Sequence, residues 1–185
     1  MDKRDLEQLL SDVAGGSVAP ADALTRIQTA PTADLGFAQL DLSRGVRQGA
    51  GEVVYGAGKT AEQIAAIIEA LRDAGQERIL VTRLDAEKAA RTSELLDNGI
   101  DLGYVPDAQL ALVGGKPSPT GNGRIVVACA GTSDLPVAEE AALTAEFYGN
   151  EVDRLYDVGV AGLHRLLAHA EELAQAQVVI AIAGM

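Results

Sequence analysis

Small, hydroxyl and acidic residues directly follow an apolar run in the second half of the chain. Residues 125–130 are apolar, and Gly131, Thr132, Ser133 and Asp134 come next, ahead of a segment with helical spacing. Glycine lets a backbone approach a ligand closely, and hydroxyls beside the N–H groups of a helix N-terminus suit a phosphate. An Asp or Ser that simply caps the helix produces the same pattern. The spacing leaves both alternatives open: a phosphate cradle or a capped helix.

A second polar group follows the next predicted strand. Gly159 and Gly162 make a turn there, and His164 and Arg165 begin the helix that comes after it. Histidine titrates near neutral pH, so His164 is a candidate acid/base group, with Asp134 expected nearby. The alternative is a surface histidine on a helix.

The sequence GAGKT at residues 56–60 is close to a phosphate-binding P-loop. That motif requires a further glycine at position 53, where this chain has Val53. A loop without it is too short to wrap a phosphate chain with backbone N–H groups. We therefore expect Lys59 to be a cation near a helix N-terminus, or simply an exposed lysine, and not part of an ATP site.

These groups must be positioned by the elements of the second half of the chain. The pattern predicts strands over 125–130, 151–156 and 178–183, with helices over 135–148 and 161–173 between them. Nearly pure apolar strands indicate a parallel sheet covered on both faces. Ligands of such sheets bind at the carboxyl ends of the strands. Gly184 follows the third strand, so we expect it at the same edge as residues 131–134.

The first half of the chain predicts a mixture of helices and short strands, an α+β region. We expect helices over 5–14, 20–29, 61–74 and 85–97, strands over 37–44, 52–56 and 78–82, and two short strands or a strand and a turn within 102–113. Residues 114–123 contain four Gly and two Pro and read as a linker. The predicted domains are therefore 1–117, an N-terminal α/β region, and 118–185, a partial parallel βαβαβ domain of doubly wound, flavodoxin-like type.

Composition excludes several classes of protein. A net charge of −12 argues against a nucleic-acid partner, because binding to a polyphosphate relies on Lys and Arg. No apolar segment has the length of a signal peptide or a membrane span. Cys129, the single cysteine, allows no disulfide within the chain and fits a reducing cytoplasm. It lies in the apolar run IVVACA, where we expect it to be buried. The acids form no recognisable metal-ligand cluster, so the sequence requires no metal.

The third predicted strand ends almost at the last residue, Met185. Three strands and two helices make half of a doubly wound sheet, and the edge of the last strand would be open to another strand. We therefore expect this chain to be a fragment of a longer protein.

The segments GTSDLPVAEEA, HR and AGM, each after its own strand, resemble the AIR carboxylase (PurE-type) domain. FAQLDLSRGVRQGAGEVVYGAGKT, NGIDLGYVPDAQLALVGG and DVGVAGLHRLL narrow the resemblance to the LarB family of nickel-pincer nucleotide cofactor biosynthesis. The resemblance covers about residues 34–185 and implies an α/β protein with a PurE-like domain.

The resemblance implies a reaction. Nicotinic acid adenine dinucleotide would be carboxylated with CO2 on its pyridinium ring, and its phosphoanhydride would be hydrolysed to release AMP and pyridinium-3,5-biscarboxylic acid mononucleotide. The family uses a cysteine nucleophile near its C-terminus, beyond the end of this chain. A homo-octamer is also implied, and Mg²⁺ is an open question.

The resemblance further implies site residues. Gly131, Thr132, Ser133, Arg165 and Gly184 are expected to bind substrate. Asp134 and His164 are expected to be catalytic, although Leu163 stands where the family has Ala before His-Arg.

Two alternatives remain open. One alternative is an AIR carboxylase-like enzyme of purine biosynthesis, although a minimal enzyme of that kind lacks a long N-terminal region. The other is a non-catalytic nucleotide-binding module.

Overall fold

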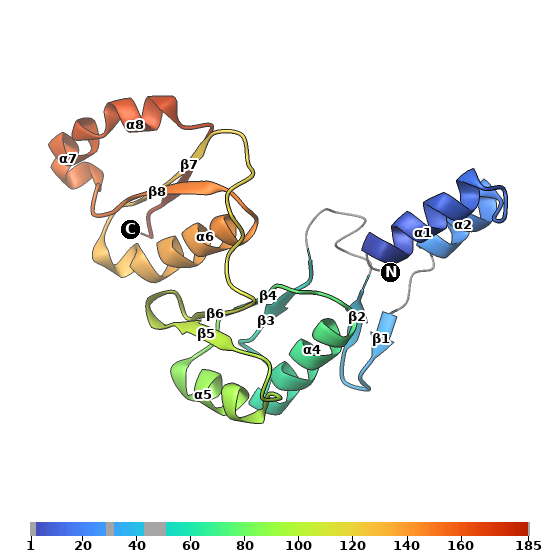
Figure 1. The fold of residues 1–185 in the computed structure, drawn as a ribbon. Helices are drawn as coiled ribbons and strands as arrows, with labels where there is room; N and C mark the ends of the chain where they lie inside the picture. Colours follow the sequence, from blue (N-terminus) through green and yellow to red (C-terminus); the bar gives the residue numbers. More distant parts are fainter. Residues whose placement is uncertain (1–2, 29–31, 43–50, 185) are drawn as a thin grey trace.

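The chain folds into a helical hairpin followed by two larger sheets that share one helix (Figure 1). The computed structural model describes residues 3–28, 32–42 and 51–184. Helices α1 (Lys3–Ala14) and α2 (Pro20–Gln28) form the hairpin and confirm the helices predicted there. Residue 29 of the second predicted helix lies outside the described residues. Of the described helices, none is long and apolar enough to cross a membrane.

A small antiparallel ladder follows the hairpin. Strands β1 (Thr32–Asp34) and β2 (Gln39–Asp41) pair with each other, so the single strand predicted over 37–44 was too long, and β1 was missed. The chain reverses between them because the Asp34 carboxylate accepts a hydrogen bond from the Gly36 N–H at 2.8 Å. Gly36 adopts a left-handed φ of 78°, which glycine tolerates at no steric cost. Residues 43–44 of the predicted strand lie outside the described residues.

The four-stranded sheet has the strand order β3-β4-β6-β5. Its members are β3 (Val53–Tyr55), β4 (Ile79–Thr82), β5 (Leu102–Val105) and β6 (Leu110–Val113). Strands β3 and β4 are parallel, whereas β6 pairs antiparallel with both β4 and β5. The strands predicted over 52–56 and 78–82 and the two short strands within 102–113 are confirmed.

Helices α4 (Ala61–Asp73) and α5 (Ala86–Leu95) pack against one face of this sheet. Helix α4 begins at Thr60, whose hydroxyl accepts from the Gln63 N–H while the Gln63 side chain accepts from the Thr60 N–H, which is a complete capping box. Its Ile64 and Ile68 are fully buried, as the helical spacing predicted. Helix α5 begins one residue later than predicted, because Asp85 is its N-cap, and ends two residues earlier, because Leu96 is already extended.

The three-stranded sheet has the order β8-β7-β9, with all strands parallel. It consists of β7 (Arg124–Cys129), β8 (Glu151–Leu155) and β9 (Val178–Ile182), close to the predicted ranges. Alternate residues of β7 are buried on opposite faces. Val127 and Cys129 pack under helix α6, and Val126 packs with Leu166 and Leu173 on the other face. The predicted α/β class and the parallel βαβαβ arrangement are confirmed.

Helix α6 (Leu135–Phe147) lies between the two sheets and contacts both. Its small residues Ala138 and Ala142 face the three-stranded sheet. Its large residues Leu143 and Phe147 pack with Leu80 and its neighbours on the four-stranded sheet. Because α6 is apolar on two sides, it holds the two sheets together in one body.

The single helix predicted over 161–173 is wrong. The structure has a 3-10 turn, Val160–Gly162, followed by two short helices, α7 (Leu163–Ala168) and α8 (Ala170–Gln175). The helix is interrupted at His169, whose N–H bonds the Leu166 carbonyl in a tightened turn. The His169 Nδ1 also lies 3.1 Å from a Glu172 carboxylate oxygen.

Candidate functional site

A pocket of about 430 Å³ opens at the carboxyl ends of β7 and β9, beside the loop that follows β8. This is the edge at which parallel sheets bind ligands. Its polar lining residues are Ser133, Asp134 and Arg165, with Gly131 and Gly159 contributing backbone. The remaining wall is apolar and comes from all three strand ends: Ala128–Ala130, Val158, Val160, Ala161, Leu166 and Ala181–Ala183.

Asp134 joins two of these strand ends. Residues Thr132–Asp134 form a 3-10 turn between β7 and α6. One carboxylate oxygen of Asp134 accepts from the Gly131 N–H at 3.1 Å, and the other accepts from the Gly184 N–H at 3.0 Å. Each oxygen of this side chain thus accepts one backbone N–H. The acid therefore occupies two backbone donors that a bound phosphate would otherwise use.

The loop after β8 continues the parallel pairing beyond the strand. The Val158 N–H donates to the Cys129 carbonyl, and the Gly159 N–H donates to the Ala130 carbonyl, each at 3.0 Å. A Cβ at Gly159 would lie 2.8 Å from the Ala130 carbonyl oxygen, closer than real side chains come. Position 159 therefore has to be glycine for the loop to pack here.

Arg165 presents its guanidinium to the pocket and is held by a neighbouring acid. It forms an ion pair with Asp157, which follows Tyr156, the first residue after β8. Both side chains of the pair are partly exposed. Asp157 has a left-handed φ of 57°, an uncommon conformation for a non-glycine residue. A Cβ at Gly162 would lie 2.7 Å from the Arg165 Nε, so the absence of a side chain there leaves room for the guanidinium. Asp157 was missed by sequence reasoning. Its position two residues after the end of β8 was the available signal.

The structure brings together some predicted site residues and separates others. Gly131, Ser133, Asp134 and Arg165 line the pocket, whereas Thr132, His164 and Gly184 lie outside its lining. Gly184 is nevertheless tied to the site through Asp134. His164 is exposed on α7, next to Arg165.

Cys129 forms part of the pocket floor but is 1% exposed. Its thiol donates to the Gly131 carbonyl at an Sγ–O distance of 3.7 Å. It packs with Val127, Ala138 and Ala142, so the expected burial is confirmed. A buried thiol in apolar surroundings is a poor nucleophile.

The GAGKT loop lies at the carboxyl end of β3, in the other sheet. The Lys59 ammonium donates to the Tyr55 carbonyl at 2.8 Å, and the Lys88 ammonium donates to the Gly56 carbonyl at 3.2 Å. Lys59 thus binds the end of β3, and Lys88 binds the first residue of the loop. Across the described ranges, no group of three or more His, Cys, Asp or Glu side chains is arranged to hold a metal ion.

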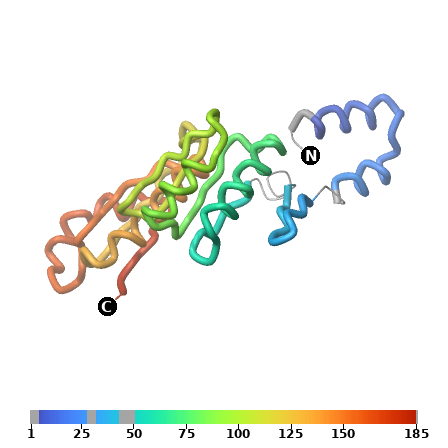
Figure 2. The backbone as a smooth tube through the Cα atoms, turned by 90° about the horizontal axis from the view of Figure 1, so that it is seen from below, coloured from blue at the N-terminus to red at the C-terminus, as the bar shows by residue number. Residues whose placement is uncertain are grey.

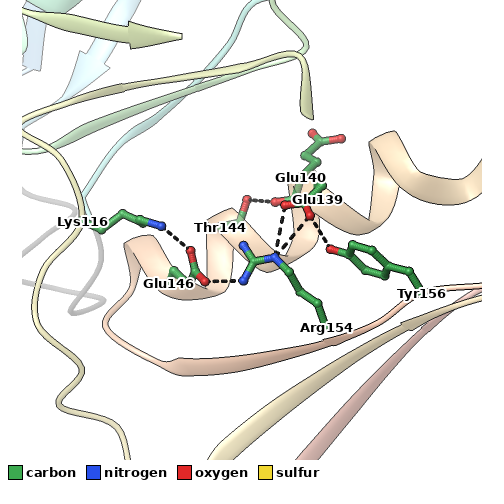
Figure 3. A network of polar contacts seen from close by, with 7 residues as sticks. All are labelled: Lys116, Glu139, Glu140, Thr144, Glu146, Arg154 and Tyr156. Carbon is green, nitrogen blue, oxygen red and sulfur yellow. Dashed lines mark hydrogen bonds and ion pairs between the residues drawn. The ribbon is translucent and has the colours of Figure 1, made fainter. Parts of the chain in front are cut away.

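A half-buried network of charged side chains fixes α6 beside the site (Figure 3). Arg154 of β8 reaches Glu139 at 3.3 Å and forms an ion pair of 2.5 Å with Glu146. Lys116 also binds Glu146, at 2.7 Å, and the Tyr156 hydroxyl donates to Glu139 at 2.7 Å. Glu139 is thus held by Arg154 and Tyr156. The acids of α6 bind the strand that leads into the pocket loop.

The network shifts the pKa of its members. Burial raises the pKa of Glu146, but hydrogen bonds from Arg154 and Lys116 outweigh it, and the net pKa lies below the usual value. The hydrogen bond with Glu146 raises the pKa of Arg154. Burial and the bond to Glu139 raise the pKa of the Tyr156 hydroxyl. Arg154 thus stays cationic and Tyr156 neutral throughout the physiological range.

The four-stranded sheet is joined to α6 by an ion pair as well. Arg83 follows β4 with a left-handed φ of 54° and lies 2.8 Å from Glu140 of α6. Neither Arg83 nor the network around Arg154 was predicted, because these contacts join segments that are distant in sequence.

Comparison with known proteins finds two similarities. Residues 32–114 match the family model described as LarB/PurE-like N-terminal domain. An uncharacterized protein of Methanocaldococcus jannaschii is 33% identical over 151 residues, which cover 80% of this chain and 59% of that relative. The chain thus spans less than two thirds of the relative's length. The aligned length exceeds the range 32–114, so the likeness extends beyond that domain.

Proposed function

We propose that the chain belongs to a carboxylase/hydrolase that acts on nicotinic acid adenine dinucleotide, because residues 32–114 match the LarB/PurE-like N-terminal domain. The observation that carries the proposal is the pocket at the carboxyl edge of the three-stranded sheet. Arg165, Ser133 and Asp134 line this pocket, and Asp134 also accepts a hydrogen bond from the Gly184 N–H. A cation and hydroxyls beside an apolar wall suit a ligand that joins phosphates to an aromatic ring.

In the proposed reaction, a thiolate adds to the electron-poor pyridinium ring and makes a neighbouring ring carbon nucleophilic. That carbon attacks CO2 and forms a carbon–carbon bond. Loss of the proton from the same carbon and expulsion of the thiolate restore the aromatic ring. Water then cleaves the phosphoanhydride and releases AMP.

Each residue has a proposed role. Arg165 and the Ser133 hydroxyl, which line the pocket, bind the phosphates, and the hydroxyl of the neighbouring Thr132 assists from outside the lining. Asp134 acts as a positioning residue that holds the loops after β7 and β9 together, because both of its oxygens already accept backbone N–H groups. His164, next to Arg165 at the rim, is the proposed acid/base group for a substrate that extends beyond the pocket.

Cys129 does not fit the thiolate role. It is buried, and its thiol donates to the Gly131 carbonyl. We therefore propose that residues 1–185 bind the dinucleotide without turning it over, and that Cys129 is not the thiolate that adds to the ring. Assembly into a homo-oligomer belongs to the same proposal and rests on the resemblance alone.

The test separates binding from turnover. The chain is incubated with nicotinic acid adenine dinucleotide and bicarbonate, and mass spectrometry looks for AMP, the dicarboxylated mononucleotide and any adduct on Cys129. We expect binding by calorimetry and no product. Turnover by this chain, or an adduct on Cys129, would show that the nucleophile is misassigned. Binding of an aminoimidazole ribonucleotide in place of the dinucleotide would favour the AIR carboxylase alternative.

A further inference from the structure

Asp157 is the acid that pairs with the arginine of the pocket. Its carboxylate forms an ion pair with the Arg165 guanidinium, and among the residues that the structure describes Arg165 makes no other hydrogen bond or ion pair. Within the described ranges, Arg165 is also the only Lys or Arg that lines the pocket. An anion that binds Arg165 therefore shares one guanidinium with the Asp157 carboxylate.

The chain on both sides of Asp157 is anchored. Before it, the Tyr156 hydroxyl donates to Glu139 of α6 at 2.7 Å. After it, the Val158 N–H donates to the Cys129 carbonyl at 3.0 Å. Between these anchors Asp157 has a left-handed φ of 57°, a conformation that costs free energy in a residue other than glycine. Such strain persists mainly at functional sites. The anchored backbone keeps the Asp157 carboxylate beside the pocket.

The charges at the pocket do not balance. Asp134 and Asp157 are two acids, whereas Arg165 is the one basic residue among the described lining residues and their ion-pair partners, which leaves an excess of one negative charge. The α1–α2 hairpin lies at the far end of the molecule from the three-stranded sheet (Figures 1 and 2). The described part of the hairpin therefore supplies no compensating cation.

This excess of negative charge distinguishes two kinds of phosphate. A terminal phosphate monoester carries a charge of about −1.5 to −2 at pH 7, because its second pKa is about 6. A phosphate inside a diester or a dinucleotide lacks that second ionisable group and carries about −1. When bound to Arg165, either phosphate lies about 4–6 Å from the Asp157 carboxylate, the range over which like charges disfavour each other. Because the acids outnumber the arginine, the doubly charged monoester is disfavoured more.

We propose that Asp157 is a specificity-determining residue, which makes the pocket prefer the internal phosphate of a dinucleotide to the terminal phosphate of a mononucleotide. The inference rests on the function proposed above, in which Arg165 binds phosphate. The substrate of that reaction is a dinucleotide, whereas both products are mononucleotides with terminal phosphates. The charge that favours the substrate therefore also favours release of the products.

Two ligands that differ by one methyl group test this selection. Calorimetry at about pH 7.5, where AMP is doubly charged, measures the dissociation constants of AMP and of its phosphate methyl ester, without divalent cations. The proteins are the wild type, Asp157→Asn, Asp157→Gly and the control Asp153→Asn. Asparagine tolerates a left-handed φ and keeps an acceptor oxygen for Arg165, so Asp157→Asn removes the charge alone. Asp153 of β8 also pairs with an arginine, Arg124, at the opposite edge of the sheet.

We expect the wild type and Asp153→Asn to bind the methyl ester about threefold to tenfold more tightly than AMP. The effect stays in this range because water screens the charge of Asp157, whose side chain is 57% exposed. In Asp157→Asn and Asp157→Gly, which both accept the left-handed φ, the preference should fall by at least about threefold. Circular dichroism of each variant checks that the fold is kept.

Three outcomes would overturn the proposal: equal affinity of the wild type for the two ligands, an unchanged preference in both Asp157 variants, or no binding of either ligand. Nicotinic acid adenine dinucleotide is titrated in parallel. If the dinucleotide does not bind while the preference between AMP and its methyl ester follows Asp157, the substrate proposed above is wrong and the charge selection by Asp157 holds.

Discussion

The Asp134 carboxylate accepts a hydrogen bond from the backbone N–H of Gly184, fifty positions away in the sequence, at 3.0 Å. Through its second oxygen the same carboxylate holds the Gly131 N–H. The ends of β7 and β9 are thus fixed to each other at the mouth of the pocket. A Cβ at Gly184 would lie 3.0 Å from the same carboxylate oxygen, which is why a small residue suits this position.

Replacing Asp134 by asparagine should weaken the connection between the ends of β7 and β9. An amide offers one acceptor oxygen, and its NH2 group would face the second backbone N–H, which then loses its partner. We expect Asp134→Asn to lower the free energy of unfolding by about 1–2 kcal/mol and to weaken dinucleotide binding. Denaturant unfolding and calorimetry measure the two effects. Glu171→Gln, on exposed α8, is the control. If both variants match the wild type, Asp134 does not position the loops.

The close approach of Gly159 to Ala130 predicts a second outcome. In Gly159→Ala the new methyl group meets a backbone carbonyl at 2.8 Å, and the loop after β8 must shift. We expect a loss of about 1–3 kcal/mol in the free energy of unfolding. In Gly58→Ala nothing lies within 4 Å of the added carbon, so that variant should stay within about 0.5 kcal/mol of the wild type. Equal stabilities of the two variants would contradict the packing described for the loop.

The lowered pKa of Glu146 predicts a dependence on pH. Its ionised form is stabilised by Arg154 and Lys116, so its folded pKa lies below the unfolded value of about 4.3. The stabilisation is complete above the unfolded pKa and is lost as pH falls through the folded pKa. We expect Glu146→Gln to be about 2 kcal/mol less stable than the wild type at pH 7, with a difference that shrinks below about pH 4. Urea unfolding at several pH values measures it. A difference that does not change with pH would show that Glu146 acts by packing alone.

Lys59 should not support ATP hydrolysis. Its ammonium donates to the Tyr55 carbonyl, and Val53 stands where a phosphate-wrapping loop requires glycine. We expect no ATPase activity above background in either the wild type or Lys59→Ala, measured by phosphate release. Robust hydrolysis that disappears in Lys59→Ala would make residues 56–60 a nucleotide site.

Local patterns in the sequence predicted most elements of this fold. The stripe of Ile64, Ile67, Ile68 and Leu71 identified α4, and the apolar run around Val127 identified a buried strand. Periodicity did not reveal the break at His169 or the β1 strand, because each depends on a single turn. The turn at Asp34 and Gly36 is the signal that was missed.

The candidate site was predicted in part. Asp134, Ser133 and Arg165 were identified because they follow strands of a parallel sheet, whose carboxyl ends share one edge. Asp157 and the contacts of Glu139 and Glu140 depend on side-chain geometry between distant segments, which spacing cannot specify. Helix α6 is apolar on two sides, which predicts burial but not which two surfaces it separates.

The most direct measurement is a calorimetric titration of nicotinic acid adenine dinucleotide into the wild type, Arg165→Met and Arg124→Met. Arg165 faces the pocket, whereas Arg124 begins β7 at the opposite edge of the same sheet and is likewise paired with acids. Loss of a charge-assisted bond to phosphate is worth about 1.5–3 kcal/mol. The account predicts that Arg165→Met weakens binding at least about tenfold, while Arg124→Met binds like the wild type. Equal affinities of the three proteins, or no binding by any of them, would contradict it.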